Sequence, residues 1–233
     1  MFIRGARKLI EIIEELLKTR EISIDELFER VRLPRDLIMN VLRGIRTCID
    51  IIDDKVIVKD PLALAFLLVK KGATFRRATR FLDWQDFEKF SAEILSAHRY
   101  IVYTNTRLTK PIRLEVDVLG VDPGSGRTIV IDCKHWSRGI HRSQLVQIAE
   151  KHCTRTKKFL QYISWAQVKH RELRYVKYAV PIIVTLTTPV VRFHSNVLIV
   201  SVQELNQVLS DIHVVVETFG LEPIKRGVYT GSW

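Results

Sequence analysis

The chain has 233 residues, of which 47% are hydrophobic, and a formal net charge of +11 at pH 7. This hydrophobic content is enough for a folded core and argues against wholesale disorder. Three widely spaced cysteines do not form a disulfide framework. The apolar runs are shorter than the roughly 18 residues of a membrane span, and the charged residues of the N-terminal segment argue against a signal peptide. We expect a cytoplasmic protein that makes no contact with a membrane.

The positive charge is concentrated in the middle of the chain. Residues 1–60 contain 12 Lys/Arg and 12 Asp/Glu, residues 61–180 contain 22 and 10, and residues 181–233 contain 3 and 4. A localised basic surface favours a polyanionic partner, of which nucleic acid is the simplest. The alternative is a basic surface without a partner, and the uneven distribution of charge argues against it.

Residues 1–60 carry the pattern of three helices followed by a hairpin. Apolar spacing predicts an amphipathic helix over residues 6–18, a Ser-x-x-Glu capping box predicts a second over residues 23–31, and a proline begins a third over residues 34–44. Residues 48–58 predict a hairpin that turns at two aspartates. This order is similar to a winged helix-turn-helix domain. The side chains that could contact DNA from the third helix are Arg35, Asn40, Arg43 and Arg46.

This first domain is electrically neutral and its hairpin tip is acidic, so protein–protein interaction is an equal alternative to DNA contact. An apolar helix and a basic connector follow it. We therefore divide the chain into a winged-helix-like domain over residues 1–60, a connecting helix and linker over residues 61–80, and a second domain over residues 81–233.

The second domain is organised around a predicted β-hairpin over residues 113–136, preceded by a helix over residues 84–98 and a strand over residues 100–105. The turn lies in an Asp-Pro-Gly-Ser-Gly cluster. If the cluster's central Gly-Ser forms the turn, Asp117 lies directly opposite Asp132. Two opposed carboxylates repel each other, and a divalent cation such as Mg²⁺ or Mn²⁺ between them would remove the repulsion.

This hairpin resembles the PD-(D/E)XK nuclease superfamily, which includes type II restriction endonucleases, archaeal Holliday junction resolvases and methylation-dependent restriction nucleases. The matching residues are Asp117 and, after fourteen intervening residues, Asp132-Cys133-Lys134. Val116 stands where many members have proline, a position that varies in the superfamily. The alternative is a solvated hairpin face with a Glu115–Lys134 pair, which leaves the two aspartates unexplained.

The resemblance implies Mg²⁺- or Mn²⁺-dependent hydrolysis of phosphodiester bonds. Asp117, Asp132 and the backbone carbonyl of Cys133 would hold the ion, and Lys134 would orient the attacking water or stabilise charge in the transition state. Members commonly carry a glutamate in the preceding helix, within a Phe-Glu pair such as the one that contains Glu88. Glu88 would bind the same ion, or a second ion through water. Glu93 is the less favoured alternative.

Residues 143–162 predict a basic helix suited to phosphate contacts, and apolar runs over residues 179–186 and 197–202 predict buried strands. The resulting fold class is α/β, a restriction-endonuclease-like core with a mixed central sheet flanked by helices. The end of the chain, residues 210–233, carries no clear pattern. The candidate nucleic-acid-binding side chains on and before the basic helix are Arg138, Arg142, Gln144, Lys151, Arg155, Lys157 and Lys158. Gln144 also matches a position where some superfamily members place a glutamine in the site.

Zinc binding is a less favoured alternative. The candidate ligands would be Cys133, His135, His141, His152 and Cys153, which lack the paired spacing of zinc sites. Adjacent residues of a helix, such as His152 and Cys153, diverge by about 100°.

Three functional classes are therefore considered. The first is a metal-dependent DNA endonuclease, restriction-like or structure-specific, that needs no small-molecule cofactor. The second is a catalytically silent DNA-binding protein on the same fold, against which the complete set of candidate residues argues. The third is a winged-helix regulator with a sensing domain, which the neutral first domain disfavours.

We also expect a homodimer, because symmetric cleavage of a duplex needs two sites and because the first helix has a wide apolar face over residues 9–17.

Overall fold

The structure is a computed structural model that describes residues 2–74, 77–78, 80–136 and 140–227. The chain divides into two compact units, Met1–Asp86 and Phe87–Trp233. The connecting helix predicted after residue 60 belongs to the first of these units. Across the described ranges, every helix is too short or too polar to cross a membrane.

The first unit combines helices with a three-stranded antiparallel sheet of order β1-β3-β2. The predicted helices and hairpin are all present, and the two turn residues, Asp53 and Asp54, have φ angles of 48° and 60° that suit a tight hairpin. Strand β1 is an addition that the sequence pattern did not predict. The elements are α1 (Phe2–Thr19), β1 (Glu21–Ser23), α2 (Ile24–Val31), α3 (Arg35–Gly44), β2 (Ile49–Ile52), β3 (Lys55–Val58) and α4 (Pro61–Lys70).

The apolar face of α1 is buried inside the first unit. Ile12, Ile13, Leu16 and Leu17 are at most 1% exposed. Helix α1 packs against α2, α3 and α4 of the same unit. The expectation that this face forms a dimer interface is therefore wrong, because neighbouring helices already cover it.

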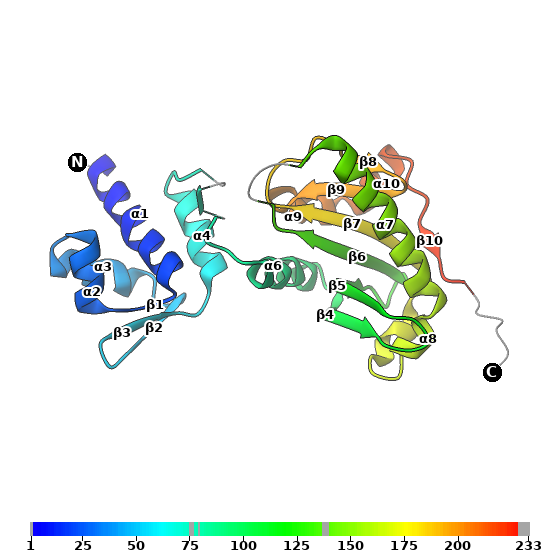
Figure 1. The fold of residues 1–233 in the computed structure, drawn as a ribbon, viewed down its shortest axis with the longest axis horizontal. Coiled ribbons are helices and arrows are strands. Elements are labelled where there is room, and N and C mark those ends of the chain that lie inside the picture. The colour runs from blue at the N-terminus through cyan, green and yellow to red at the C-terminus, as the bar shows by residue number, and fades with distance from the viewer. Residues whose placement is uncertain (1, 75–76, 79, 137–139, 228–233) are drawn as a thin grey trace. The chain divides into compact units, whose positions relative to one another are not determined.

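The second unit, with the helix that leads into it, contains the central sheet (Figure 1). Its elements are α6 (Trp84–Ala97), β4 (Ile101–Leu108), β5 (Leu114–Val121), β6 (Arg127–Lys134), α7 (Arg142–Gln161), α8 (Ile163–Ala166), the 3-10 helix η1 (Arg171–Tyr175), β7 (Tyr178–Thr185), β8 (Phe193–His194), β9 (Val197–Ser201), α9 (Val202–Ser210), α10 (Ile212–Thr218) and β10 (Ile224–Lys225).

The strands lie in the order β4-β5-β6-β7-β9-β8, and β10 pairs with β7. Strands β4, β5 and β6 are antiparallel neighbours, whereas β6, β7 and β9 run parallel. Helix α7 leads from β6 toward β7 and crosses one face of the sheet (Figure 1). Because both faces of the parallel strands are covered, β7 is buried from its second residue to its last. The predicted mixed sheet flanked by helices is confirmed.

The central hairpin has the predicted register. Val118 pairs with Ile131 and Val121 with Thr128, so the next step of the same register places Asp117 opposite Asp132. The turn needs a glycine at Gly126, where φ is +80° and an added Cβ would lie 2.8 Å from the backbone oxygen of a neighbouring tyrosine.

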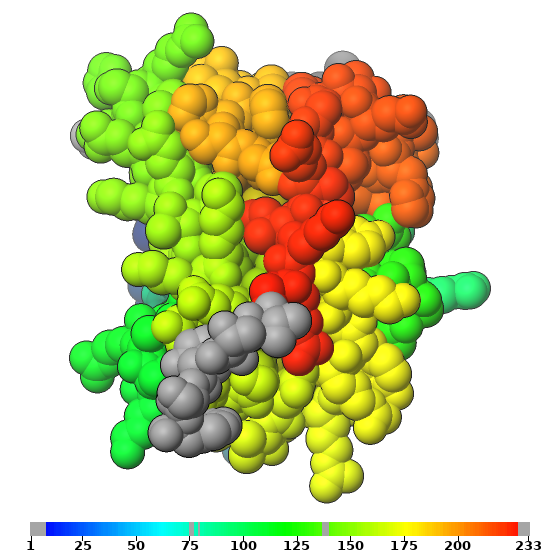
Figure 2. Space-filling model, turned by 90° about the vertical axis from the view of Figure 1, so that its right-hand side faces the viewer, coloured from blue at the N-terminus to red at the C-terminus, as the bar shows by residue number. Residues whose placement is uncertain are grey.

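Helix α10 and strand β10 complete the second unit, in a part of the chain that carries no clear sequence pattern. Strand β10 pairs Ile224 with Ala179 and Lys225 with Tyr178, at the start of β7 where β9 does not reach. Figure 2 shows this segment in red between α7 and the chain that leads into β7. It therefore extends the sheet beside its parallel strands.

Candidate active site

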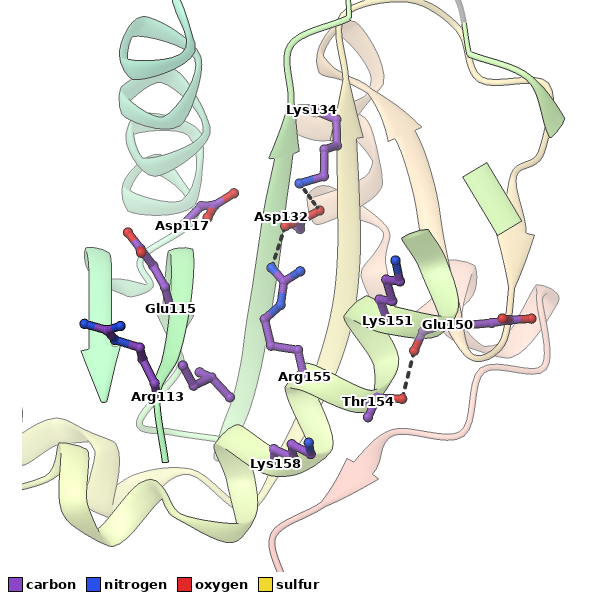
Figure 3. A pocket seen from close by; sticks show the side chains of 11 residues that line it. Arg113, Glu115, Asp117, Asp132, Lys134, Glu150, Lys151, Thr154, Arg155 and Lys158 are labelled. Atoms are coloured by element: carbon purple, nitrogen blue, oxygen red, sulfur yellow. Dashed lines mark hydrogen bonds and ion pairs between the residues drawn. The ribbon is translucent and has the colours of Figure 1, made fainter. Parts of the chain in front are cut away.

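The structure brings together the acidic residues predicted on the hairpin. Asp117 of β5 and Asp132 of β6 line one pocket of about 600 Å³, together with Lys134 (Figure 3). Beyond Val118 the two strands no longer pair as a ladder, and the Asp117 side chain enters the gap. Its Oδ2 accepts a 2.8 Å hydrogen bond from the backbone N–H of Cys133. The hairpin therefore opens where the two aspartates face each other.

Asp132 is the most deeply buried acid of this pocket, with a side chain that is 0% exposed. Lys134 Nζ lies 2.8 Å from its Oδ2, and Arg155 Nη1 donates a 2.7 Å hydrogen bond to its Oδ1. Burial alone would raise the pKa of Asp132, but the basic groups of His152, Lys134 and Arg155 outweigh it, so the pKa lies below its ordinary value. Asp132 is therefore ionised at neutral pH.

His152 of α7 lies behind this aspartate and is 1% exposed. Its Nε2 is 3.0 Å from the backbone oxygen of Val130. Burial lowers the pKa of His152 to about 4. The imidazole is therefore neutral at pH 7, so its charge favours the Asp132 carboxylate only in acid, and at pH 7 the charge of Asp132 is balanced by Lys134 and Arg155.

Asp117 has a different electrostatic environment from Asp132. Burial raises the pKa of Asp117, and the negative charge of Asp132 raises it further. The hydrogen bond from Cys133 N–H and the charges of Lys134 and Arg155 oppose this rise without cancelling it. The two aspartates thus repel each other, as the sequence predicted for directly opposed carboxylates.

Glu88 reaches the same region from α6. It is 7% exposed, and its Oε2 accepts a 3.1 Å hydrogen bond from Asn105 Nδ2. Burial and the negative charge of Asp117 raise the pKa of Glu88 to about 7. The alternative, Glu93, is exposed and lies 4.0 Å from Lys89 of the same helix. Of the two glutamates, Glu88 is the one beside the aspartates.

Asn105 is a site residue that sequence reasoning missed. It has a φ of 50° in the middle of β4, a left-handed conformation that is uncommon outside glycine but tolerated by asparagine. The pairs Thr104–Val118 and Thr106–Val116 flank it, so Asn105 faces Asp117 across an interruption of the ladder. An asparagine inside a strand pattern is the signal that could have identified it.

The predicted nucleic-acid-binding residues fall into three groups. Lys151, Arg155 and Lys158 of α7 line the pocket, and so does Arg113, which the sequence analysis did not single out. Residues that are exposed but lie outside its lining are Arg142, Gln144 and Lys157. Arg43 and Arg46 are exposed in the first unit, and Arg138 lies outside the described residues. Arg155 differs from the prediction, because it contacts Asp132 instead of standing free for phosphate.

The donor set suits an oxygen-preferring divalent cation. Beyond the effect of burial, the charge of Asp132 raises the pKa of Asp117 and the charge of Asp117 raises that of Glu88, so a bound cation would relieve repulsion. In the described part of the chain, however, no three His, Cys, Asp or Glu side chains lie close enough together to hold an ion. Lys134 and Arg155 occupy the oxygens of Asp132 instead. The residue types suit a metal ion, and to bind one Asp132 would have to exchange at least one of these two partners.

The described residues do not support the zinc alternative. Cys133 Sγ lies 3.5 Å from Ser91 Oγ and points into the core between β6 and α6. Burial raises the pKa of the Cys133 thiol well above its usual range, which disfavours the thiolate that zinc binds. The Nε2 atom of His152 lies 3.0 Å from the backbone oxygen of Val130, so this ring nitrogen already has a partner.

Comparison with known proteins relates this geometry to a family. Residues 79–184 match the family model Mrr_cat, described as restriction endonuclease. The chain is 32% identical over 143 residues to an uncharacterized protein of Archaeoglobus fulgidus, and the match covers 60% of the chain and 98% of that protein.

Two solved structures also match. The restriction endonuclease FokI matches with a TM-score of 0.41 and 14% identity, over 94% of this chain and 47% of FokI. Protein VC1899 of Vibrio cholerae matches with a TM-score of 0.33 and 10% identity, over 94% of this chain and 58% of that protein. This chain thus spans about half the length of either of them.

Proposed function

Because the chain belongs to the PD-(D/E)XK restriction-endonuclease-like superfamily, we propose that it is a metal-dependent endonuclease that hydrolyses phosphodiester bonds of DNA. One observation carries the proposal. Asp117, Asp132 and Lys134 line a single pocket, and Glu88 is close enough to Asp117 for its pKa to respond to that charge. These are the residue types, in the order along the chain, that the superfamily motif requires.

The two aspartates are the ligands that would hold Mg²⁺ or Mn²⁺, with the Cys133 carbonyl and Glu88 as further oxygen donors. A divalent cation at such a site lowers the pKa of a bound water and neutralises charge on the scissile phosphate. Lys134 is positioned two residues from Asp132 on the same strand face, so its ammonium can orient the attacking water or stabilise the charge that develops on the phosphate.

Arg155 has a double role in this proposal. In the metal-free protein it neutralises the buried Asp132, at a separation of 2.7 Å. If Asp132 were to hold a metal ion, the guanidinium would be free to enter the pocket that Lys151 and Lys158 also line. A guanidinium there suits a phosphate group of the substrate, because its planar donors match phosphate oxygens.

DNA is the proposed substrate because basic side chains surround the two aspartates, although Glu115 and Glu150 also line the pocket. Arg113, Lys151 and Lys158 line it beside Arg155. These side chains can follow a phosphate backbone past the aspartates, and such contacts carry affinity but no sequence information. The helices and hairpin of the first unit would add a winged-helix DNA contact through Arg43 and Arg46.

The homodimer remains part of the proposal for a functional reason alone. One site of this kind hydrolyses one strand, so symmetric cleavage of a duplex or a junction needs two sites. Light scattering on the full chain at tens of micromolar tests this. Twice the monomer mass is expected, and the monomer mass would remove the dimer from the account.

Substrate class is tested by incubating the full chain with supercoiled, linear and branched DNA, and with RNA of matched sequence, in Mg²⁺ or Mn²⁺ and in EDTA. We expect metal-dependent cleavage of at least one DNA and none in EDTA. Binding of DNA without cleavage of any substrate in either metal would instead favour the catalytically silent alternative.

A further inference from the structure

The second unit contains another cavity, of about 420 Å³, at the opposite end of β6 from the candidate active site. Arg127, the first residue of β6, lines this cavity, whereas Asp132 near the end of the same strand lines the catalytic pocket. Side chains alternate along a strand, so residues five positions apart point to opposite faces of the sheet. The two pockets are therefore separate.

The floor of the cavity is a row of side chains in register on three strands. Tyr178 of β7 pairs with Arg127 of β6 on one side and with Lys225 of β10 on the other. Helix α10 covers the row, and its residue His213 lies 2.9 Å from Arg127 Nη1 through Nε2. An aromatic ring between two cations is thus built into the sheet by strand pairing.

The charge of this cavity is not balanced by its own lining. The described residues that line it include Arg127, Lys177 and Lys225 but no aspartate or glutamate. Neither lysine forms an ion pair with a described residue, whereas Arg127 pairs through Nη2 with Asp122, a residue outside the lining, at 3.8 Å. An anionic ligand would supply the missing negative charge.

The other wall of the cavity is apolar. Val180 and Ile212 are at most 2% exposed, and Val216 and Pro223 complete this wall. A cavity of a few hundred Å³ with apolar walls and a few convergent polar groups has the size and character of small-molecule sites. The ligand it suits therefore has an anionic end and a flat or apolar body.

We infer that this cavity binds a nucleoside phosphate. The phosphate would lie between the exposed Lys177 and Lys225, because ammonium groups are common phosphate donors in proteins; Arg127, already paired with Tyr100, His213 and Asp122, would add its positive charge nearby. The base would contact Tyr178 and the apolar wall, since aromatic rings stack on bases of any identity. This inference does not depend on the proposed nuclease function, because it uses none of the residues of the catalytic pocket.

Isothermal titration calorimetry on the full chain in EDTA tests the inference, with AMP, ATP, adenosine and inorganic phosphate as separate probes. We expect saturable binding of AMP or ATP with a Kd below about 1 mM, and weaker binding of adenosine and of phosphate alone. The variants Lys225→Glu and Lys177→Glu should each weaken nucleotide binding at least about tenfold, because each reverses a charge at the phosphate.

Two control variants locate the site. Lys169→Glu reverses an exposed charge away from the cavity, and Lys158→Ala removes a charge from the catalytic pocket; both should leave nucleotide affinity within about twofold. Circular dichroism confirms that each variant is folded. Three results would overturn the inference: no saturable nucleotide binding, affinity unchanged by both Lys225→Glu and Lys177→Glu, or a loss in Lys158→Ala equal to theirs.

Discussion

Arg155 Nη1 lies 2.7 Å from Oδ1 of Asp132, so a cation from α7 is paired with the most buried carboxylate of the hairpin. Lys134 contacts the other oxygen of that carboxylate at 2.8 Å. An unpaired charge at this depth would be costly, and the two cations offset that cost. They also occupy the oxygens that the proposed metal site needs, which makes metal binding an exchange of partners.

The first prediction concerns this exchange. Arg155→Ala removes one competitor for Asp132, so the affinity of the DNA-free protein for Mn²⁺ should rise at least about threefold, the size expected for loss of one competing ion pair. Cleavage of DNA should fall, because the guanidinium is no longer available to the phosphate. Titration calorimetry with Mn²⁺ measures the affinity.

Lys158→Ala is the matched control for this prediction. It removes the same charge from the lining of the same pocket but leaves both partners of Asp132 in place. Its Mn²⁺ affinity should change less than that of Arg155→Ala. Equal affinities in Arg155→Ala and the wild type would show that Arg155 does not compete with the ion.

The second prediction concerns the pH dependence of stability in the metal-free protein. Burial and the charge of Asp117 raise the pKa of Glu88 to about 7 in the folded chain, from an ordinary value of 4.5. The folded state therefore binds this proton more tightly than the unfolded state, so ionisation of Glu88 costs stability as pH rises from about 4.5 to about 7. Glu88→Gln removes this cost.

Urea unfolding in EDTA at several pH values measures the effect. Relative to the wild type, Glu88→Gln should gain free energy of unfolding as pH rises to about 7, with no further gain above it. Glu93→Gln, an exposed position on the same helix, should run parallel to the wild type. A Glu88→Gln profile parallel to the wild type would contradict the assigned environment of Glu88.

The third prediction concerns the path of the DNA backbone. Lys151→Ala combined with Lys158→Ala should weaken DNA binding and reduce the salt slope of log K by about 2, because each lost phosphate contact reduces it by about 0.9. Lys157→Ala removes a charge from the same helix outside the pocket and should leave the slope nearly unchanged. Fluorescence anisotropy over a salt series, in EDTA, distinguishes the variants. If Lys157→Ala alone reduced the slope by half as much as the double variant does, the proposed path would be contradicted.

The fourth prediction separates core from interface in α1. Leu16 is 0% exposed inside the first unit, so Leu16→Ala should destabilise that unit by about 2–5 kcal/mol through loss of packing. Because the residue lies in a core and not at an interface, the effect on the unfolding midpoint should not depend on protein concentration. If the effect of Leu16→Ala on the unfolding midpoint depended on protein concentration, α1 would instead belong to a subunit interface.

Much of the hairpin that carries Asp117 and Asp132 could be predicted from sequence, because turn chemistry restricts the register. A turn centred on the Gly-Ser of the Asp-Pro-Gly-Ser-Gly cluster, with a period of two along each strand, places Asp117 opposite Asp132, and the structure has this register. The direction of the Glu88 side chain could also be predicted, because its place on the flank of an apolar helix face limits where the side chain can point.

The partners made by tertiary packing could not be predicted. Arg155 belongs to a helix that crosses the sheet, and helical periodicity gives the face it occupies but not the strand residue beneath it. The left-handed backbone of Asn105 interrupts a ladder in a way that strand propensity does not encode. Strand β10 is two residues long, too short for any periodic signal, and exists because β7 offers an unpaired edge there.

The most direct test of the central claim is the variant Asp132→Asn. It keeps the shape and a hydrogen-bond acceptor for Arg155 but removes the charge that the proposed cation needs. Single-turnover cleavage of the wild type's best DNA substrate, in Mg²⁺, should fall by about 100-fold or more, while DNA binding in EDTA stays equal or improves because a negative charge near the phosphate is lost. Cleavage within about twofold of the wild-type rate would contradict the assignment of this pocket as the active site.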